Sequence, residues 1–597
     1  MRNHKPGSPL LRCVLVSAFL VLSILASCSS VKFLIHGGER DKSHIRPEQP
    51  GPYVLIFAFD GAGYDQLMEA INSGKAPAMA GMLGKSEGGG LYEHAYDLPN
   101  TVSILPSTTI AAWSAIFTGS PTAWNGVPGN EWFVREDMKF YAPVPVSVAE
   151  MDDNRAMILE DLVGKALKTP TLFALAGVKS SVSLNPVYRR ADYFTAVDPI
   201  SMVALYTEFI ARGGGENSPE KMDIYEDLDT RSVPKLLDAI EDHGVSKIQV
   251  VYFPGIDLYT HLADNPLPME VNYLETVTDP LVAQILAYYK KLGILDQTYV
   301  MIISDHGHTP VLRDPKHALG SDSNQSPADV VKAAGFRPRK FVLNPAKDEQ
   351  DYQAAFAYQG AIAYVYLADR STCRDPGTTC DWKRPPRWRQ DVLPVARAFY
   401  TSNKTGYPEP KMKDTLDLIF ARVPTPAGQP TMEYQVFDGH RLVPIPDYLE
   451  EHPRPDLIQL NRRMRWLSAG PYGNRSGDIL LLTRSGLNLP IRNRYYFSGP
   501  YHSWHGSASW QDSHIPLIVA RQNYSNAKLK EVVDEVAGPR PSQLSLVPIV
   551  LRLLATDPTK GIPGAPTPAA AAPTPAPIAT PAAPESAPSV TPAAKSQ

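Results

Sequence analysis

The sequence predicts an α/β fold in which helices cover both faces of a mostly parallel sheet. Three nearly continuous apolar runs, over residues 53–59, 248–253 and 299–303, are typical of strands buried on both faces of such a sheet. Acidic or imidazole side chains follow each run within a few residues, and open α/β sheets bind ligands beyond the carboxyl ends of their strands. The 597-residue chain is 43% hydrophobic and 20% charged, which is ordinary for a globular protein.

The first 50 residues are predicted to be an export signal and a tether. A basic start precedes an apolar run over 14–26, which is shorter than the ~20 residues of a membrane-spanning helix. The run ends in Leu25-Ala26-Ser27-Cys28, which resembles the bacterial lipoprotein box. We therefore expect a signal peptide over 1–27, a membrane anchor through lipid on Cys28 and a tether over 28–50. Ser29 favours the outer membrane of the cell envelope, facing the periplasm or the surface. A plain secretory signal with a chance cysteine is the alternative.

The other end of the chain, over 557–597, is predicted to be a disordered tail. It is rich in Ala, Pro and Thr, and it has too few large apolar residues to offset the loss of chain entropy. Ten of the 57 prolines lie between Pro563 and Pro592. The formal net charge is −4, whereas a dedicated nucleic-acid binder is usually distinctly basic, so no stable nucleic-acid complex is expected.

Each of the three predicted strands ends at residues that can carry chemistry. Asp60 and Gly61 follow the first strand, Asp257 and His261 follow the second, and the run 305–308 (Asp-His-Gly-His) follows the third. Asp257 and His261 are four residues apart, so one helical turn would put both on the same side, where they suit a shared zinc ion. Any one of these residues is equally explained by a turn, but three such strand ends are hard to explain by chance.

Two further segments carry polar side chains of the same kind. A helix is predicted to begin near Thr109 and to be ended by Gly119. A hydroxyl at a helix N-terminus is either a simple cap or a nucleophile whose developing charge meets the positive end of the helix. The segment 499–507 contains His502 and His505 and precedes a strand-like run over 515–519.

Taken in chain order, these motifs resemble the alkaline phosphatase superfamily, in particular its type I phosphodiesterase/nucleotide pyrophosphatase family. The matching motifs are Phe59-Asp60-Gly61, Pro106-Ser107-Thr108-Thr109 with Thr118-Gly119, Asp257-x-x-x-His261, Ser304-Asp305-His306-Gly307 and His505-Gly506. The resemblance implies an alkaline-phosphatase-like sheet sandwiched by helices and a metal-dependent phosphoric ester hydrolase.

The same resemblance implies a site with two zinc ions, other divalent metals being left open. One ion would be held by Asp257, His261 and His505, and the other by Asp60, Asp305, His306 and the hydroxyl oxygen of Thr109. Thr109 would attack phosphorus and form a phospho-threonine that water hydrolyses, while the metal pair clamps both ends of the displacement. The substrate class implied is a small phosphate ester, either a nucleotide or a lipid headgroup.

Other residues near these motifs are further candidates for the site. Asn130 matches the position from which the family donates a hydrogen bond to a phosphoryl oxygen, and a surface-loop Asn is the alternative. His308 is a candidate for holding a ligand in orientation. His502 competes with His505 as a ligand, and the His-Gly pattern favours His505. Eukaryotic nucleotide pyrophosphatases often have Pro-Asn-His where this chain has Ala-Ala-Trp over 111–113, which puts nucleotide specificity in doubt.

The domain organisation predicted is one catalytic domain with an insertion. The catalytic parts are expected over 51–334 and 491–556, and an inserted α+β cap over 335–490. Cys373 and Cys380 lie in a turn-rich loop of the cap, where an exported protein is expected to form a small structural disulfide. A metal pair is the weaker alternative, because no further cysteine completes a site.

Three other functions compete with phosphodiester hydrolysis. A phosphomonoesterase would add cations near the transferred group, and Arg189 and Arg190 are the candidates. A transferase would move a phospho-headgroup to an alcohol in place of water. A non-catalytic envelope lipoprotein would keep only the fold, and the intact Thr109 and ligand set argue against it.

Overall fold

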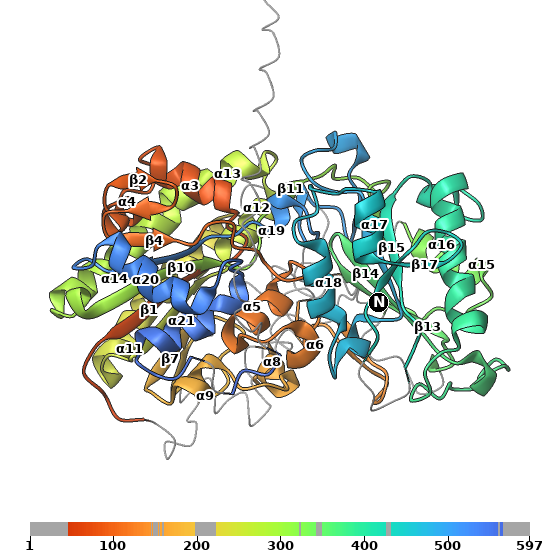
Figure 1. Cartoon of the computed structure of the whole chain (residues 1–597), viewed down its shortest axis with the longest axis horizontal. Helices are drawn as coiled ribbons and strands as arrows, with labels where there is room; N and C mark the ends of the chain where they lie inside the picture. The colour runs from red at the N-terminus through yellow and green to blue at the C-terminus, as the bar shows by residue number, and fades with distance from the viewer. Residues whose placement is uncertain are drawn as a thin grey trace, which may run out of the picture.

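The computed structural model describes residues 46–144, 146, 153, 156–157, 160–196, 222–320, 324–341, 349–425, 431–558 and 561–564. Over these residues the chain forms two adjacent units, each built around one large sheet (Figure 1). The predicted signal over 1–27, the lipidation site Cys28 and most of the predicted tail lie outside the described residues.

A nine-stranded sheet forms the centre of the first unit, in the order β2-β3-β4-β21-β10-β1-β9-β7-β8. Five strands run parallel, from β10 through β1, β9 and β7 to the edge strand β8, and the remaining strands extend the other edge in antiparallel fashion. The predicted α/β class with a mostly parallel sheet is thereby confirmed. The strand bounds are β1 Tyr53–Phe59, β2 Ser86–Gly88, β3 Leu91–Tyr92, β4 Ala95–Asp97, β7 Ser180–Ser183, β8 Tyr193–Thr195, β9 Ile248–Phe253, β10 Thr298–Ser304 and β21 Leu517–Ala520.

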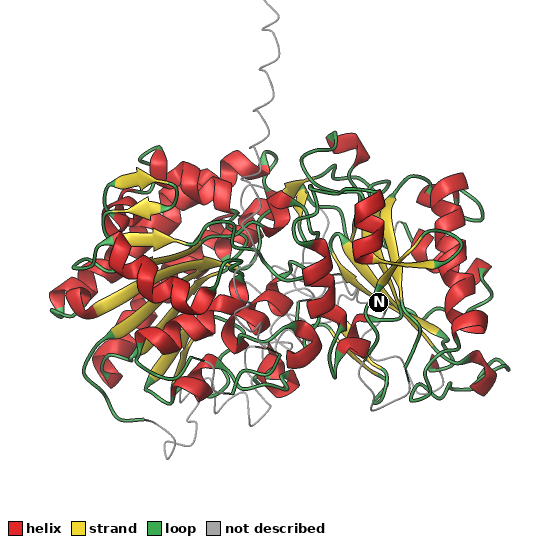
Figure 2. Ribbon diagram, in the orientation of Figure 1, coloured by secondary structure: helices red, strands yellow, loops and turns green. Residues whose placement is uncertain are grey.

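Helices cover both faces of this sheet (Figure 2). Side chains of β1 alternate between the faces: Val54 and Ile56 enter one core, while Leu55 and Phe57 enter the other. The first core is closed by α5 Thr109–Thr118, α9 Leu172–Ala176, α20 Asn526–Ala537 and α21 Leu546–Leu553. The second is closed by α3 Tyr64–Asn72, α4 Pro77–Leu83, α11 Met222–His243, α12 Gly255–Leu262, α13 Pro266–Tyr273 and α14 Asp279–Lys291. Because both faces are buried there, the central strands β1, β9 and β10 carry apolar residues at nearly every position.

The second unit contains an antiparallel six-stranded sheet in the order β13-β14-β18-β15-β16-β17. Its strands are β13 Ala354–Gln359, β14 Ile362–Leu367, β15 Leu416–Ala421, β16 Gln435–Phe437, β17 Leu442–Pro444 and β18 Ile479–Thr483. One face packs against α17 Ile445–Glu451 and α18 Leu460–Ser468, and the other against α15 Ser326–Ala333 and α16 Leu393–Thr405. Three short segments complete the α-helices of the described residues: α6 Thr122–Asn125, α8 Leu162–Ala166 and α19 Trp510–Ser513.

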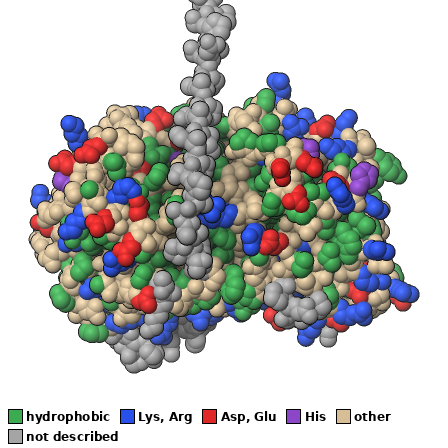
Figure 3. Space-filling model, in the orientation of Figure 1, with side chains coloured by type: hydrophobic (Ala, Val, Ile, Leu, Met, Phe, Trp, Pro, Cys, Tyr) green, Lys and Arg blue, Asp and Glu red, His purple; other side chains and the backbone are tan. Residues whose placement is uncertain are grey.

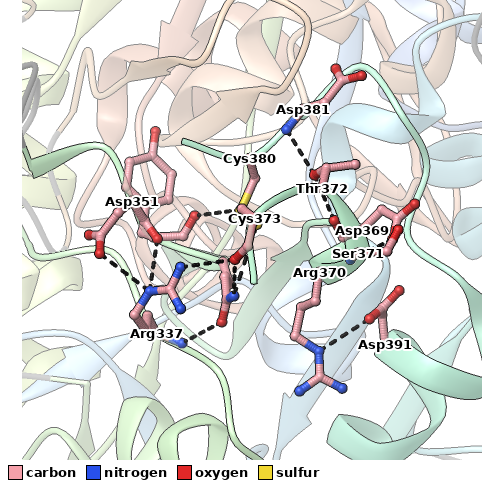
Figure 4. Close-up of a disulfide and its surroundings, with 12 residues drawn as sticks. Arg337, Asp351, Asp369, Arg370, Ser371, Thr372, Cys373, Cys380, Asp381 and Asp391 are labelled. Carbon is pink, nitrogen blue, oxygen red and sulfur yellow. Dashed lines mark hydrogen bonds and ion pairs between the residues drawn. A yellow bond between two sulfur atoms is a disulfide. The ribbon is translucent and has the colours of Figure 1, made fainter. Parts of the chain in front are cut away.

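A disulfide joins Cys373 and Cys380 in the loop that follows β14 (Figure 4). The Arg337 guanidinium donates to the carbonyl oxygen of Cys373 at 3.2 Å and pairs with Asp351 at 3.4 Å. Both half-cystines are buried, so the bridge closes a loop of the second unit against its core.

Three two-stranded ribbons supplement the large sheets. They are β5 Trp132–Val134 with β6 Lys139–Tyr141, β11 Thr309–Pro310 with β20 Ser503–Trp504, and β12 Ala318–Leu319 with β19 Tyr496–Phe497. The last two pair the chain just after β10 with the chain that returns from the second unit. They therefore bring the segment around residue 505 to the carboxyl end of β10.

On the face drawn in Figure 3, acidic and basic side chains are interspersed, which agrees with the small net charge. Ile562 packs against the first core, so order extends into the segment from 557 that the composition predicted to be a tail. None of the helices in the described ranges is long and apolar enough to cross a bilayer.

Candidate active site

The carboxyl ends of β1, β9 and β10 meet at one edge of the large sheet. β1 lies between the other two strands and is parallel to both. Asp60 therefore follows the central strand, Asp257 stands in the first turn of α12 after β9, and Asp305 follows β10. The topology alone brings together three carboxylates that are spread over nearly 250 residues of the sequence.

One group of acceptors surrounds His306. Its Nε2 lies 3.3 Å from Asp305 Oδ2, 3.6 Å from Asp60 Oδ1 and 3.4 Å from Thr109 Oγ1. The backbone N–H groups of Gly61 and His306 each donate to Asp305 Oδ1 at 3.0 Å, which fixes that carboxylate. The Tyr252 hydroxyl donates to Asp60 Oδ2.

A second group surrounds Asp257. Its Oδ1 lies 3.3 Å from His261 Nε2 and 3.6 Å from His505 Nε2. Asp257 and His261 occupy the same side of α12 because they are one turn apart. The ring of His505 stacks on that of His306 with centroids 3.6 Å apart, so the two groups are direct neighbours.

The ribbon of β11 and β20 carries His505 into the site. His502 precedes β20 in the chain, whereas His505 follows it. The Nε2 atom of His502 is 3.3 Å from Asp264 Oδ1, and His502 belongs to neither group of acceptors. The structure thus brings together all seven residues expected as ligands, with His505 rather than His502 as the third histidine. These residues are Asp60, Thr109, Asp257, His261, Asp305, His306 and His505.

The donor atoms fit divalent cations. Asp60 Oδ1, Asp257 Oδ1 and Asp305 Oδ2 are buried and make no hydrogen bond within the described residues. Burial, followed by the charge of Asp305, raises the pKa of Asp60 well above its usual range, because carboxylates crowd together out of water. Burial also lowers the pKa of His306 to about 3, which leaves a neutral imidazole lone pair. Carboxylate and neutral imidazole ligands in buried sets of three suit zinc.

Thr109 is the first residue of α5, as the sequence predicted for this helix. The side chain of the preceding residue, Thr108, makes no capping hydrogen bond to the helix. The Thr109 hydroxyl therefore stands at the positive end of a ten-residue helix, within reach of the acceptors around His306.

Asn130 lies beside this helix start. Its Oδ1 accepts a hydrogen bond from the Ile110 N–H at 2.9 Å, and its own N–H donates to Gln359 Oε1 at 2.7 Å. The side-chain Nδ2 group makes no hydrogen bond to the described part of the chain. Gln359 and Tyr252 are site-supporting residues that the sequence did not indicate, because both lie inside strands with no local motif.

The two candidate cations for monoester recognition differ in their contacts. The Arg189 side chain donates to the carbonyl oxygens of Gly164 at 2.7 Å and Leu167 at 3.2 Å. Arg190 is exposed, and its backbone carbonyl oxygen accepts from the Arg46 side chain at 3.4 Å. Among the ion pairs of the described residues, none joins a Lys or Arg to Asp60, Asp257 or Asp305.

Comparison with known proteins identifies the family. The model of the type I phosphodiesterase/nucleotide pyrophosphatase family matches residues 54–376, more than half of the chain. A search of curated proteins gives no match. Among solved structures, the murine ectonucleotide pyrophosphatase/phosphodiesterase 5 is 12% identical with a TM-score of 0.46, over 84% of this chain and 95% of that one. The human protein gives the same values, and an inactive murine variant in complex with AMP is 11% identical with the same TM-score and coverage. The chain thus belongs to the type I phosphodiesterase/nucleotide pyrophosphatase family and is a phosphoric ester hydrolase.

Proposed function

We propose that the chain hydrolyses phosphodiester or pyrophosphate bonds through a covalent intermediate on Thr109, at a site with two zinc ions. The observation that carries this proposal is the position of the Thr109 hydroxyl, 3.4 Å from His306 Nε2 and at the start of α5. A lone hydroxyl at a helix N-terminus is commonly a cap, but this one faces a buried set of unpartnered carboxylate oxygens. The substrate class proposed is a small phosphate ester, a nucleotide or a lipid headgroup.

The two ions would be held by the two groups of acceptors. Asp257, His261 and His505 form one set, and Asp60, Asp305 and His306 form the other together with the hydroxyl oxygen of Thr109. When bound, such ions supply Lewis acidity that favours the alkoxide form of the threonine and stabilises the leaving oxygen.

The chain's own groups account for the remaining chemistry. The Thr109 oxygen forms a bond to phosphorus as the bond from phosphorus to the leaving oxygen breaks, and water later displaces Thr109 from phosphorus. The N-terminus of α5 favours negative charge on the attacking oxygen. The Asn130 Nδ2 group is available to donate to a non-bridging phosphoryl oxygen, where charge accumulates in the transition state.

Paired assays with a p-nitrophenyl diester and the matching monoester test this proposal. We expect zinc-dependent turnover that favours the diester, its loss on chelation, and a fall of at least about 100-fold in Thr109→Ala with metal content unchanged. Thr108→Ala is the matched control, because that hydroxyl makes no capping hydrogen bond to α5, and it should keep most of the activity. A zinc-loaded wild type that turns over neither ester contradicts the proposal for these substrates, and equal or greater monoester turnover favours a phosphomonoesterase.

We also propose that the protein is exported and anchored through lipid on Cys28 in the bacterial cell envelope. The support is the apolar run over 14–26 that ends in Leu-Ala-Ser-Cys. Labelled palmitate should enter the wild type and not Cys28→Ser, and incorporation that persists in the variant contradicts the anchor.

A further inference from the structure

A tight turn of the second unit reaches the candidate active site. Strands β13 and β14 are joined by two residues, Gly360 and Ala361, and Gln359 pairs with Ile362 across the turn. The Ala361 N–H donates to the carbonyl oxygen of His505 at 2.9 Å. The hairpin of the second sheet is therefore hydrogen-bonded to the backbone of an expected metal ligand of the first unit.

The side chain of Gln359 points to a second part of the site. It is fully buried, its Oε1 accepts from the Asn130 N–H at 2.7 Å, and its Nε2 donates to the Glu131 carbonyl oxygen at 2.5 Å. A primary amide has one acceptor and one donor group, and here each is bonded to the same short stretch of backbone. Two bonds fix both the place and the orientation of that backbone.

Two glycines allow Gln359 to approach both segments closely. A Cβ on Gly129, which precedes Asn130, would lie 2.2 Å from Gln359 Oε1. A Cβ on Gly506, which follows His505, would lie 2.1 Å from the Gln359 carbonyl oxygen. Real Cβ atoms do not come so near, so these positions need glycine where the backbone meets another chain segment. The turn is thus packed directly against the chain on both sides.

Asn130 lies in a loop, where such support matters. The loop connects α6, which ends at Asn125, to β5, which begins at Trp132. One hydrogen bond from the Ile110 N–H reaches the Asn130 side chain, and the backbone is held by Gln359. A displacement of about 1 Å in a catalytic arrangement can lower the rate by about 100-fold, so the position of this loop affects catalysis strongly.

We propose that Gln359 is a positioning residue of the active site, through which the second unit takes part in catalysis. Its side chain holds the phosphoryl-oxygen donor Asn130, and the backbone of the same turn holds His505. Because both contacts come from one turn, the donor and the histidine keep a fixed position relative to each other. The inference rests on the proposed function and assigns to the second unit a part in it.

Gln359→Met in two backgrounds tests the role. Methionine has a similar length and volume, but it bonds neither to the Asn130 N–H nor to the Glu131 carbonyl oxygen, and the bond from Ala361 to His505 remains. With zinc-loaded protein and the p-nitrophenyl diester, we expect kcat to fall about 10-fold or more, with KM and zinc content little changed. In Asn130→Asp, which already lacks the Nδ2 donor, the same substitution should cost almost no further kcat.

Gln353→Met is the matched control. Gln353 is a buried glutamine just before β13, about 20 Å along the strand from Gln359, and its Nε2 donates to the Cys373 carbonyl oxygen at 2.9 Å. It therefore loses buried hydrogen bonds of the second unit away from the site. We expect it to lower the melting temperature about as much as Gln359→Met and to leave kcat unchanged.

The possible results separate the two proposals. An unchanged kcat in Gln359→Met overturns the positioning role and leaves the proposed function intact. An equal fold-loss in the wild-type and Asn130→Asp backgrounds also overturns it, because Gln359 then does not act through the Asn130 donor. A wild type without zinc-dependent turnover shows that the proposed function is wrong, and the positioning role falls with it. If Gln359→Met does not fold, Gln359→Glu, which keeps the acceptor for the Asn130 N–H, takes its place in both backgrounds.

Discussion

Asn130 has a different partner for each end of its side-chain amide. Its Oδ1 accepts from the Ile110 N–H at 2.9 Å, which ties it to the first turn of α5. The other end of the amide, Nδ2, makes no hydrogen bond in the described residues. The backbone of Asn130 is itself held by Gln359, so the donor is positioned before substrate arrives.

Asn130→Asp separates the acceptor role of Oδ1 from the donor role of Nδ2. The carboxylate keeps an acceptor for the Ile110 N–H but removes the donor, so we expect an unchanged melting temperature and a fall in kcat of about 100-fold. Asn130→Ala, which loses both, should also lose stability. Steady-state kinetics and thermal melts measure both effects, and an Asp variant with wild-type kcat would show that Nδ2 does not contact the phosphoryl group.

At the scale of elements, the sequence predicted the parts of the site that parallel strands determine. Continuous apolar runs mark β1, β9 and β10, and their ends place Asp60, Asp257 and Asp305 at one edge of the sheet. The pairing of β11 with β20 was not predictable from local pattern, because each strand has two residues and they lie almost 200 residues apart. Only a motif resemblance indicated that His505 joins the site, and the pairing explains how it does so.

The antiparallel edge of the sheet contains a buried acid that makes stability depend on pH. Asp97 ends β4, accepts from the Tyr64 hydroxyl at 2.7 Å, and is fully buried. Burial raises its pKa to about 7, above the ~3.9 of an unfolded chain. The folded state thus holds this proton more tightly, and its contribution to stability is lost as pH rises between about 4 and 7.

Asp97→Asn should therefore become more stable relative to wild type as pH rises. The asparagine oxygen still accepts from Tyr64 and nothing titrates, so the difference in free energy of unfolding should grow by about 2–3 kcal/mol from pH 5 to pH 8. Denaturant unfolding at the two pH values measures it. Asp264→Asn is the control, because the Asp264 side chain is 97% exposed. If the free energies of unfolding of Asp97→Asn and wild type change with pH in parallel, the prediction is wrong.

At the scale of the whole molecule, the site joins segments from most of the described chain. The two groups of expected ligands come from the ends of β1, β9 and β10, from α5, and from the ribbon that returns from the second unit. Ions held there as proposed would bridge these segments and bind the folded state alone, so they would add to its stability.

Removal of metal should consequently lower the melting temperature. At a free ion concentration about 1,000 times the dissociation constant, one ion adds about 4 kcal/mol, which corresponds to a shift of several degrees. Differential scanning calorimetry of zinc-loaded and chelated protein measures the shift, and Asp257→Asn should show a smaller one. Equal melting temperatures with metal removal verified by elemental analysis would show that the ligand groups do not hold ions in the folded protein.

The configuration at phosphorus distinguishes a covalent intermediate on Thr109 from direct attack by water. A phosphorothioate diester of known configuration is hydrolysed in isotopically labelled water, and the configuration of the product is determined. Two successive in-line displacements, first by Thr109 and then by water, each invert the phosphorus centre, so we expect net retention of configuration. Net inversion would mean that water attacks phosphorus directly, and it would contradict a phospho-threonine intermediate.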